Sequence, residues 1–366
     1  MKIFIAANDS YGLYIFRRDL IKRLIDDGHE VYAALPVGEC TERIKELGCC
    51  FIEVPVDRRG ISPKNDLNLL LTYIKFLRKV RPDMVITYTI KPNVYCGLAA
   101  RLLRIPYAVN ITGLGTAFQR EGLVKRIAKL LYRIGCGKAK IVFTENPGDR
   151  DTLCSMKLFK PELIHVLHGA GVNTEHYAFA PYPEEREVTR FLFIGRIMQE
   201  KGINEYFAAA DKLISDGVNA QFCIAGSYDE DEYRSVVEER SRSDSFVFNG
   251  WLDDIRPAIE QAHCFVLPSW HEGMANTLLE CGAMGRPIIT SNIHGCLEAV
   301  DEGKNGYLHE VKNADSLYET MKKFADLPYD EKAAMGKRSR EFVCANFDKK
   351  QVVEDTVSSL YDKVKQ

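Results

Sequence analysis

Along the whole chain, the pattern of apolar and polar residues switches between two kinds of segment. Short runs that are apolar on both sides of a strand pleat are separated by longer stretches in which apolar residues recur every three or four positions. Strands that are apolar on both faces are typical of a parallel sheet covered by helices. The pattern therefore predicts a doubly wound α/β architecture.

In the first half, this reading predicts six strands and four helices. The strands are expected at Lys2–Ala7, Glu30–Leu35, Cys50–Val54, Met84–Tyr88, Tyr107–Ile111 and Ile141–Thr144. The helices are expected at Leu13–Asp27, Leu67–Val80, Val94–Leu103 and Leu123–Ile134.

A polar, proline-punctuated segment at residues 181–189 interrupts the alternation and is typical of an interdomain linker. We expect an N-terminal domain over 1–182 and a C-terminal domain over 183–347, with a helix at 348–366 packing back on the first. Two such domains facing each other would leave a ligand-binding cleft between them. The second-half strands are expected at Arg190–Ile194, Gln221–Ala225, Phe246–Phe248, Cys264–Leu267, Pro287–Thr290 and Tyr307–His309.

The composition agrees with two globular domains and excludes several classes of protein. The chain has 366 residues, of which 46% are hydrophobic, and a single core stops growing below that length. Eleven cysteines without a CxxC pair favour reduced thiols over disulfides or a zinc site. We expect no signal peptide, because the N-terminal apolar run is too short for one, and no run approaches the roughly 20 apolar residues of a membrane span. We therefore expect a cytoplasmic protein, soluble or peripheral to a membrane.

The net charge of −2 hides an asymmetry between the halves. Residues 1–182 carry a net charge of +9 and residues 183–366 one of −11. The basic half could face an anionic partner, or the charges could only solvate two different surfaces.

The strongest chemical signal lies in residues 268–285, where a predicted strand runs through a short loop into a helix starting near Ala275. The helix N-terminus offers free N–H groups to a diphosphate, and Gly273 lets the loop backbone approach a ligand. Glu272 precedes the helix and Glu280 lies inside it, eight positions later. A lone Glu is usually a solvated side chain, whereas this pair in this context could bind the hydroxyls of a sugar and of a ribose.

A second signal follows the strand that ends at Gly195. Arg196 and Lys201 stand in the next loop, before a helix expected from Ile203. Two fixed cations there could neutralise a diphosphate leaving group, although a solvated basic turn would look the same. The acidic run Asp229–Glu232 resembles a metal motif, but it falls where a surface helix should begin, and charge at a helix N-terminus explains it. We expect no metal.

Residues 120–140 form a basic amphipathic pattern. Apolar residues recur at helical spacing at Leu123, Ile127, Leu130, Leu131 and Ile134, and the cations are Arg120, Lys125, Arg126, Lys129, Arg133, Lys138 and Lys140, opposed only by Glu121. Such a helix suits an anionic membrane surface, but its apolar stripe could equally face the core. Nucleic acid is disfavoured because no basic motif interleaved with aromatic residues is present.

Together these motifs resemble family four of the retaining glycosyltransferases, which have the GT-B fold of two Rossmann-like domains facing a central cleft. The resemblance spans essentially the whole chain. Its further landmarks are Ala225-Gly226-Ser227, Gly250 followed by Trp251 and Asp254, and Glu298 ahead of Asn305-Gly306-Tyr307.

The resemblance implies roles for these residues. Arg196 and Lys201 would bind the donor diphosphate, Glu272 the donor sugar and Glu280 the ribose. The other donor-binding residues would be Gly12, Gly195, Gly226, Trp251, Gly273, Met274, Ala275, Asn276 and Thr277. Gly12 belongs to the loop Asn8–Gly12, which lacks the family's frequent double glycine. The mechanism would be front-face attack with retention, using a UDP-sugar as co-substrate and no cofactor.

The first half is similar to a bacterial subgroup that adds a hexose or N-acetylhexosamine to polyprenyl-diphosphate-linked saccharides, as in capsule, O-antigen or N-glycan assembly. Thr89–Asn93 and Asn110–Thr116 carry this similarity. It implies a lipid-linked acceptor and favours docking of the basic helix at the inner face of the cell membrane. The candidate acceptor-binding residues are Tyr11, Lys91, Asn93, Thr112 and Gly113.

One departure from the family concerns the histidine that many members use in the N-terminal domain. The histidines before the predicted linker are His29, His165, His168 and His176, and none stands at a matching place. Two other functions remain open. One is an epimerase of the UDP-N-acetylglucosamine 2-epimerase type on the same fold, and the other is a non-catalytic module that binds nucleotide-sugars.

Overall fold

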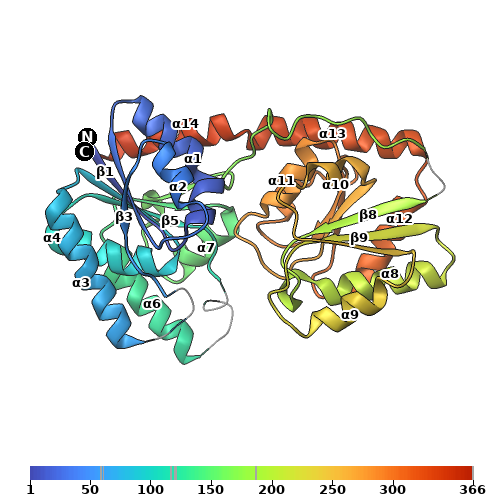
Figure 1. Cartoon of the computed structure of the whole chain (residues 1–366), viewed down its shortest axis with the longest axis horizontal. Helices are drawn as coiled ribbons and strands as arrows, with labels where there is room; N and C mark the ends of the chain where they lie inside the picture. Colours follow the sequence, from blue (N-terminus) through green and yellow to red (C-terminus); the bar gives the residue numbers. More distant parts are fainter. Residues whose placement is uncertain (58–59, 61, 116–117, 119–121, 186–187, 365–366) are drawn as a thin grey trace. The chain divides into compact units, whose positions relative to one another are not determined.

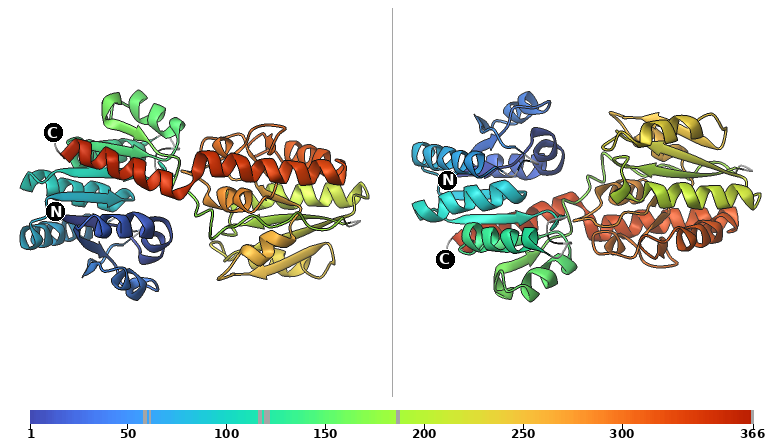
Figure 2. Two further views of the ribbon diagram at one scale, coloured as in Figure 1. Left: turned by 90° about the horizontal axis from the view of Figure 1, so that it is seen from above. Right: turned by 90° about the horizontal axis from the view of Figure 1, so that it is seen from below.

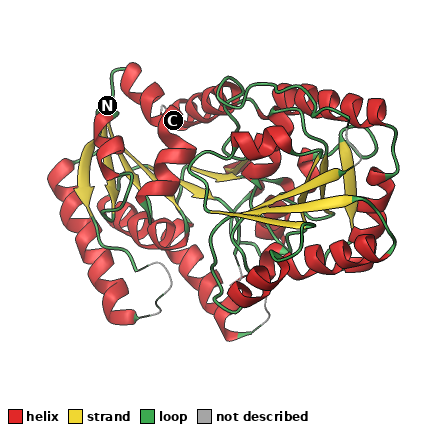
Figure 3. Ribbon diagram, turned by 45° about the vertical axis from the view of Figure 1, so that its right-hand side comes forward, coloured by secondary structure: helices red, strands yellow, loops and turns green. Residues whose placement is uncertain are grey.

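The computed structural model describes residues 1–57, 60, 62–115, 118, 122–185 and 188–364. The chain divides into two compact units: unit 1 comprises Met1–Gly171 with Lys349–Gln366, and unit 2 comprises Val172–Asp348. Each unit contains one parallel sheet with helices packed on it (Figure 1 and Figure 3). The predicted fold class, two doubly wound α/β domains, is confirmed.

Unit 1 contains a seven-stranded sheet in the order β3-β2-β1-β4-β5-β6-β7. The strands are β1 (Lys2–Ala6), β2 (Glu30–Leu35), β3 (Cys50–Glu53), β4 (Met84–Tyr88), β5 (Tyr107–Ile111), β6 (Ile141–Thr144) and β7 (Ile164–Val166). The chain turns from one side of β1 to the other after β3, so β1 and β4 form the switch point where ligands bind in such sheets. The three-residue strand β7 was not predicted, because it is too short to show a period.

Side chains that alternate along each strand enter two cores, one on each face of the sheet. Ile3 and Ile5 of β1 join the core under α1, whereas Phe4 and Ala6 join the core under α3, α4 and α6. Figure 2 shows the helices on both faces. They are α1 (Ser10–Asp26), α2 (Thr41–Glu46), α3 (Pro63–Val80), the π-helix η1 (Pro92–Cys96), α4 (Gly97–Leu103), α6 (Leu123–Cys136), α7 (Pro147–Ser155), the 3-10 turn η2 (Pro161–Leu163) and α14 (Lys349–Val364).

Helix α14 belongs to unit 1 although all of unit 2 precedes it in the sequence. Val357 and Leu360 enter the same core as α1. Asp355 accepts from His165 Nε2 at 2.9 Å, and the Tyr361 hydroxyl lies 2.7 Å from His29 Nε2. Both histidines therefore have structural roles in holding this helix.

Unit 2 contains a six-stranded sheet in the order β10-β9-β8-β11-β12-β13. The strands are β8 (Thr189–Ile194), β9 (Ala220–Ala225), β10 (Phe246–Gly250), β11 (Cys264–Leu267), β12 (Ile288–Ser291) and β13 (Gly306–His309). The helices are η3 (Gln199–Lys201), α8 (Ile203–Ser215), α9 (Tyr233–Arg240), α10 (Arg256–Gln261), α11 (Asn276–Ala283), η4 (Leu297–Ala299), α12 (Ala314–Ala325) and α13 (Tyr329–Phe347). The switch point of this sheet lies between β8 and β11.

The boundary between the units lies at Gly171/Val172 and not at the predicted 182/183. Residues 172–182 lie before or at the start of the predicted linker (181–189), and they pack on unit 2. Val172 donates its N–H to the Phe347 carbonyl at 2.8 Å, and the Tyr182 hydroxyl donates to the His263 carbonyl at 2.8 Å. The composition therefore marked the absence of regular structure and not the end of a domain.

Arg286, a residue of the unit 2 core, holds the segment around Ala180 and Pro181 by hydrogen bonds. Its side chain is completely buried and donates five hydrogen bonds to backbone carbonyls, including those of Ala180 at 3.1 Å and Pro181 at 2.9 Å. Burial lowers the pKa of Arg286 to about 10. A buried guanidinium of this kind satisfies many acceptors at once, which lysine cannot do.

We expect Arg286→Met to lower the free energy of unfolding by about 3 kcal/mol or more, because five hydrogen bonds in the core are lost together. Urea unfolding followed by circular dichroism measures this. Lys337→Met, at an exposed position on α13, should change the same free energy by no more than about 0.5 kcal/mol. Equal values for the two variants would contradict the role of Arg286.

Candidate active site

The two loops singled out in the C-terminal half leave neighbouring strands of the unit 2 sheet. β8 and β11 pair in parallel, with Phe191 opposite Cys264, so the loops after Ile194 and Leu267 start from the same edge. Gly202 makes their contact possible: it has φ +75°, and a Cβ there would lie 2.0 Å from the Pro268 carbonyl oxygen. Only glycine fits this close approach.

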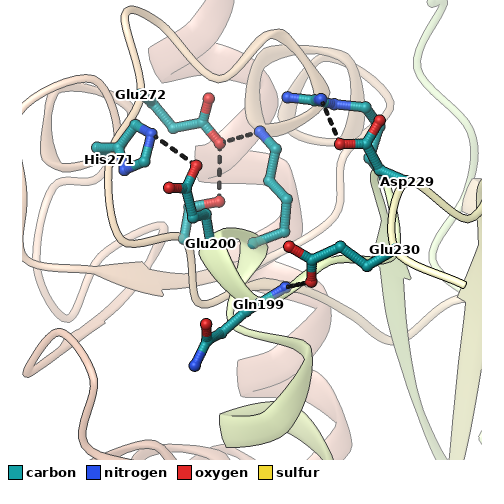
Figure 4. A network of polar contacts seen from close by, with 9 residues as sticks. Gln199, Glu200, Asp229, Glu230, His271 and Glu272 are labelled. Atoms are coloured by element: carbon teal, nitrogen blue, oxygen red, sulfur yellow. Dashed lines mark hydrogen bonds and ion pairs between the residues drawn. The ribbon is translucent and has the colours of Figure 1, made fainter. Parts of the chain in front are cut away.

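Side chains then join the two loops directly (Figure 4). Lys201 forms an ion pair with Glu272, and the Ser269 hydroxyl donates to the same carboxylate at 2.7 Å. The side chains of Lys201 and Glu272 are only 20% and 12% exposed, so water screens their attraction weakly. The structure thus brings together two of the residues predicted to bind the donor.

Glu200 links the same two loops through its backbone and its side chain. Its carbonyl accepts the Trp270 N–H at 2.9 Å, and its carboxylate lies 3.3 Å from His271 Nε2. Burial lowers the pKa of His271, while the nearby Glu200 and Glu272 carboxylates oppose this effect. His271, for which no role was assigned from the sequence, therefore lies inside the site.

The acidic run at 229–232 also reaches this site, which the sequence reading did not predict. Asp229 forms an ion pair with Arg196 at 3.1 Å, and the Glu230 carboxylate accepts the Gln199 N–H at 2.9 Å. No side chain caps the helix α9 at Glu232. The run directly precedes the helix α9, as expected, and in addition two of its carboxylates hold the Arg196–Lys201 loop.

The N-terminus of α11 lies beside Glu272 and carries the predicted backbone contacts Gly273, Met274, Ala275, Asn276 and Thr277. No side chain caps this helix at Ala275, so N–H groups of its first turn are available to an anion. Within the described part of the chain, Asn276 Oδ1 is buried without a hydrogen-bond partner. Glu280 lies in the second turn and is partly exposed.

A turn at residues 293–298 packs against this loop and supports it. A Cβ on Gly295, which has φ +89°, would lie 2.5 Å from the Glu272 carbonyl oxygen, and the Gly295 carbonyl accepts the Ala275 N–H at 2.9 Å. Glu298 accepts the Gly295 N–H at 2.7 Å. Glu298, a landmark without a role in the sequence, is thus a structural support for the Glu272 loop.

The other predicted donor residues of unit 2 differ in their setting. Gly226 packs against Gly195, since a Cβ on Gly226 would lie 1.9 Å from the Gly195 carbonyl oxygen. These glycines therefore fix the distance between two backbones. Trp251 follows β10, is 56% exposed and donates its indole N–H to Asp253 at 3.3 Å.

In unit 1, the predicted loop Asn8–Gly12 is mostly helical, because α1 begins at Ser10. Asp9 caps the helix by accepting the Gly12 N–H at 2.6 Å, so Gly12 lies in the first helical turn. Tyr11 is exposed. The predicted start at Leu13 was too late because the Asp9 cap was not recognised.

The other candidate acceptor residues of unit 1 lie after β4 and β5. Lys91 forms an ion pair with Asp66 at 2.9 Å, and both side chains are 16% exposed. Asn93 is completely buried and donates to the Asn110 carbonyl at 2.8 Å, so it holds β5 from inside and is not open to a ligand in this conformation. Thr112 and Gly113 are partly exposed. Thr116, at the end of the second sequence motif, lies outside the described residues.

Three further features at this edge were not detectable from sequence spacing. Thr89, directly after β4, has φ +69°, which is unusual for a β-branched residue, and the π-helix η1 follows at Pro92. Such strain and π-helices concentrate at functional sites. Arg17 of α1 forms a buried ion pair with Glu145 after β6, and burial raises the pKa of Glu145 although Arg17 opposes this.

Helix α6 exposes most of the apolar stripe that the sequence placed on it. Leu123, Ile127, Leu130 and Ile134 are between 40% and 72% exposed, and Val124 joins them at 57%. Only Leu131 of the predicted stripe packs on the core, which α6 reaches mainly through Tyr132, Gly135 and Cys136. Arg120 and Glu121 lie outside the described residues.

Two absences concern the part of the chain that the structure describes. No helix there is both long and apolar enough to span a bilayer. No group of three His, Cys, Asp or Glu side chains there could hold a metal ion.

We expect the Lys201–Glu272 pair to stabilise unit 2 by a coupling energy of about 1–2 kcal/mol, because both groups are shielded from water. A double-mutant cycle of Lys201→Ala and Glu272→Ala in urea unfolding measures it. The control is the ion pair of Lys304 with Asp301, whose Nζ and Oδ2 atoms lie 3.0 Å apart. Its side chains are 69% and 41% exposed, so it should couple by less than about 0.5 kcal/mol. Equal coupling in the two cycles would contradict the argument.

Comparison with known proteins relates both units to one kind of enzyme. Residues 188–326 match the model "Glycosyl transferases group 1", and residues 12–170 match "Glycosyl transferase 4-like domain". The chain is 27% identical to the Campylobacter jejuni N,N'-diacetylbacillosaminyl-diphospho-undecaprenol alpha-1,3-N-acetylgalactosaminyltransferase, covering 100% of this chain and 99% of that protein. It is 28% identical to the Escherichia coli UDP-Gal:alpha-D-GlcNAc-diphosphoundecaprenol alpha-1,3-galactosyltransferase, covering 75% and 74%.

Solved structures agree in fold. A glycosyltransferase from Rickettsia africae matches with a TM-score of 0.80 at 18% identity, covering 100% of this chain and 98% of that one. The Anabaena protein Alr3699/HepE in complex with UDP matches with a TM-score of 0.80 at 14% identity, covering 99% and 100%.

Proposed function

The chain belongs to the group 1 glycosyl transferases with the GT-B fold, and on that basis we propose that it moves a hexose or N-acetylhexosamine from a UDP-sugar to a polyprenyl-diphosphate-linked saccharide. The observation that carries this proposal is the meeting of Lys201, Glu272 and the uncapped N-terminus of α11 at the β8/β11 edge. Similarity to the Campylobacter jejuni transferase over the whole chain supports the acceptor class.

In this proposal the donor replaces contacts that already exist. Arg196 and Lys201 each hold a carboxylate, Asp229 and Glu272 respectively. The diphosphate takes the place of Glu272 at Lys201 and is held further by Arg196 and the N–H groups at the start of α11. Glu272, released from Lys201, accepts hydrogen bonds from the sugar hydroxyls, while Glu280 binds the ribose.

The proposed reaction retains the configuration at the sugar and proceeds by attack from the side of the leaving group. The acceptor hydroxyl forms the new bond to the anomeric carbon as the bond to the β-phosphate breaks, and its proton passes to that phosphate. Lys201, Arg196 and the α11 dipole stabilise the charge that develops on the leaving UDP. These fixed positive groups do the work that a divalent metal does in other transferases, so the proposal needs no metal.

We place the acceptor at the β1/β4 switch point of unit 1. Lys91, which Asp66 holds after the strained residue Thr89, would contact the acceptor diphosphate, with Tyr11, Thr112 and Gly113 nearby in the loops that follow β1 and β5. Asn93 would act from within by fixing η1 against β5.

We propose that α6 docks on an anionic membrane surface. Its exposed apolar residues lie among Lys125, Arg126, Lys129 and Arg133, and a helix of this kind rests in the headgroup region. This would place the enzyme at the inner face of the cell membrane, where a lipid-linked acceptor lies.

We expect Lys201→Ala to reduce kcat/KM for transfer from UDP-sugars to short polyprenyl-diphosphate saccharides by about 100-fold or more, because one charge on the leaving diphosphate is no longer stabilised. Lys304→Ala, at an exposed position of the same unit, should leave the rate unchanged. Transfer by Lys201→Ala at the wild-type rate would refute the diphosphate role. An epimer formed from UDP-N-acetylglucosamine alone would show an epimerase instead.

For the membrane surface, we expect the double variant Ile127→Glu/Leu130→Glu to lower binding to vesicles of phosphatidylglycerol by about tenfold or more, because two exposed apolar side chains that would enter the headgroup region become charged. Co-sedimentation measures this. Val37→Glu, at another exposed apolar position of unit 1, is the matched control and should bind as the wild type does. If the wild type does not prefer anionic over phosphatidylcholine vesicles, the docking proposal fails.

A further inference from the structure

Trp270 lies between two charged side chains that none of the roles above explains. Its indole Nε1–H donates to Glu205 Oε1 of α8 at 3.1 Å. On the face of the ring, Lys312 Nζ lies 4.3 Å from the ring centroid, within the range of a cation–π contact. Trp270 is two residues before Glu272, so this clamp holds the loop that carries the proposed sugar-binding carboxylate.

The buried position of the Glu205 carboxylate is energetically unfavourable. It is 9% exposed, and within the described residues its Oε2 is buried without a hydrogen-bond partner. Burying a carboxylate with so few partners costs free energy that an apolar side chain would not. Helix α8 is already fixed to the core by Ile203, Tyr206 and Phe207, so Glu205 is not needed to attach it.

Lys312 carries a second cost. It follows β13 and adopts φ +59°, the left-handed region that side chains other than glycine and asparagine rarely occupy. Its ammonium nevertheless lies over the Trp270 ring, and, after burial, its positive charge also contributes to lowering the pKa of His271. Glu205 and Lys312 are thus both held in unfavourable states, and both contact the indole of Trp270 although they lie far apart in the sequence.

We propose that Glu205 and Lys312 are positioning residues for the transfer reaction, acting through Trp270 to hold Glu272 and His271 in the geometry that binds the donor sugar. The backbone bond from Trp270 N–H to Glu200 ties the loop to the Lys201 side, while the indole ties it to α8 and to the β13–α12 connection. The loop is thus held at three points around Glu272. This inference rests on the proposed donor role of Glu272.

The test separates positioning from folding by comparing Glu205→Ala with Glu205→Gln. A glutamine Oε1 still accepts the indole N–H, whereas alanine leaves that donor without a partner. We expect Glu205→Ala to raise KM for the UDP-sugar by about tenfold, with KM for the acceptor unchanged, and Glu205→Gln to restore most of the loss. Glu239→Ala, an exposed carboxylate on α9, is the matched control and should match the wild type.

A spectroscopic measurement tests the clamp without any turnover. The chain has two tryptophans, so in a Trp251→Phe background all tryptophan emission comes from Trp270. Glu205→Ala and Lys312→Met should each increase the quenching of that emission by acrylamide. Glu205→Gln should leave the quenching unchanged. The kinetic measurements keep Trp251, because that residue is itself a candidate for donor binding.

The outcomes divide cleanly. Increased quenching in Glu205→Ala together with a raised donor KM supports the inference. Unchanged donor KM with a lower kcat, which indicates only fewer folded molecules, overturns it, as does quenching equal to the Trp251→Phe parent. If the wild type transfers no sugar from any UDP donor, the proposed function fails, while the quenching comparison still reports whether Glu205 and Lys312 hold Trp270.

Discussion

The candidate active site depends on one close backbone approach, that of Gly202 to the Pro268 carbonyl. Because no side chain separates these two chain segments, the loops after β8 and β11 come near enough for Lys201 to reach Glu272 and for the Trp270 N–H to reach the Glu200 carbonyl. The parallel pairing of β8 and β11 places the loops at one edge, and the glycine brings them into contact. The side-chain contacts between these two loops build on that distance.

The charge around this contact is balanced and not simply basic. Asp229, Glu230, Glu200 and Glu272 surround Arg196 and Lys201, and each of the two cations already has a carboxylate partner. In the function we propose, an incoming anion must therefore offer more than negative charge, since it has to replace an existing ion pair. A nucleotide-sugar can replace that ion pair, because its diphosphate binds the cation and its sugar hydroxyls donate hydrogen bonds to the displaced carboxylate. Free phosphate does not, and this difference is a source of specificity.

The fold could be read from the sequence because parallel strands buried on both faces and amphipathic helices leave distinct periods. Contacts between segments far apart in the chain left no such period. The predicted linker starts at Pro181, yet Arg286, which is 105 positions away, binds the Pro181 carbonyl and so holds this segment on unit 2. Asp229 and Glu230 read as capping charges, because their partners Arg196 and Gln199 belong to another strand's loop. Asn93 was predicted to be accessible to the acceptor. Its amide is instead buried against Asn110 because Asn93 lies in a π-helix, which the sequence pattern did not reveal.

The placement of α14 has a consequence for how the chain is made. Unit 2 is a single continuous stretch, so all its strands and helices are present once residue 348 has left the ribosome. Unit 1 is not: its sheet is complete by Val166, but the α1 face stays open until Val357 and Leu360 arrive, after all of unit 2. During synthesis the later unit therefore completes its core before the earlier one. The nascent chain carries an uncovered apolar surface on unit 1 for the whole time that unit 2 is being translated.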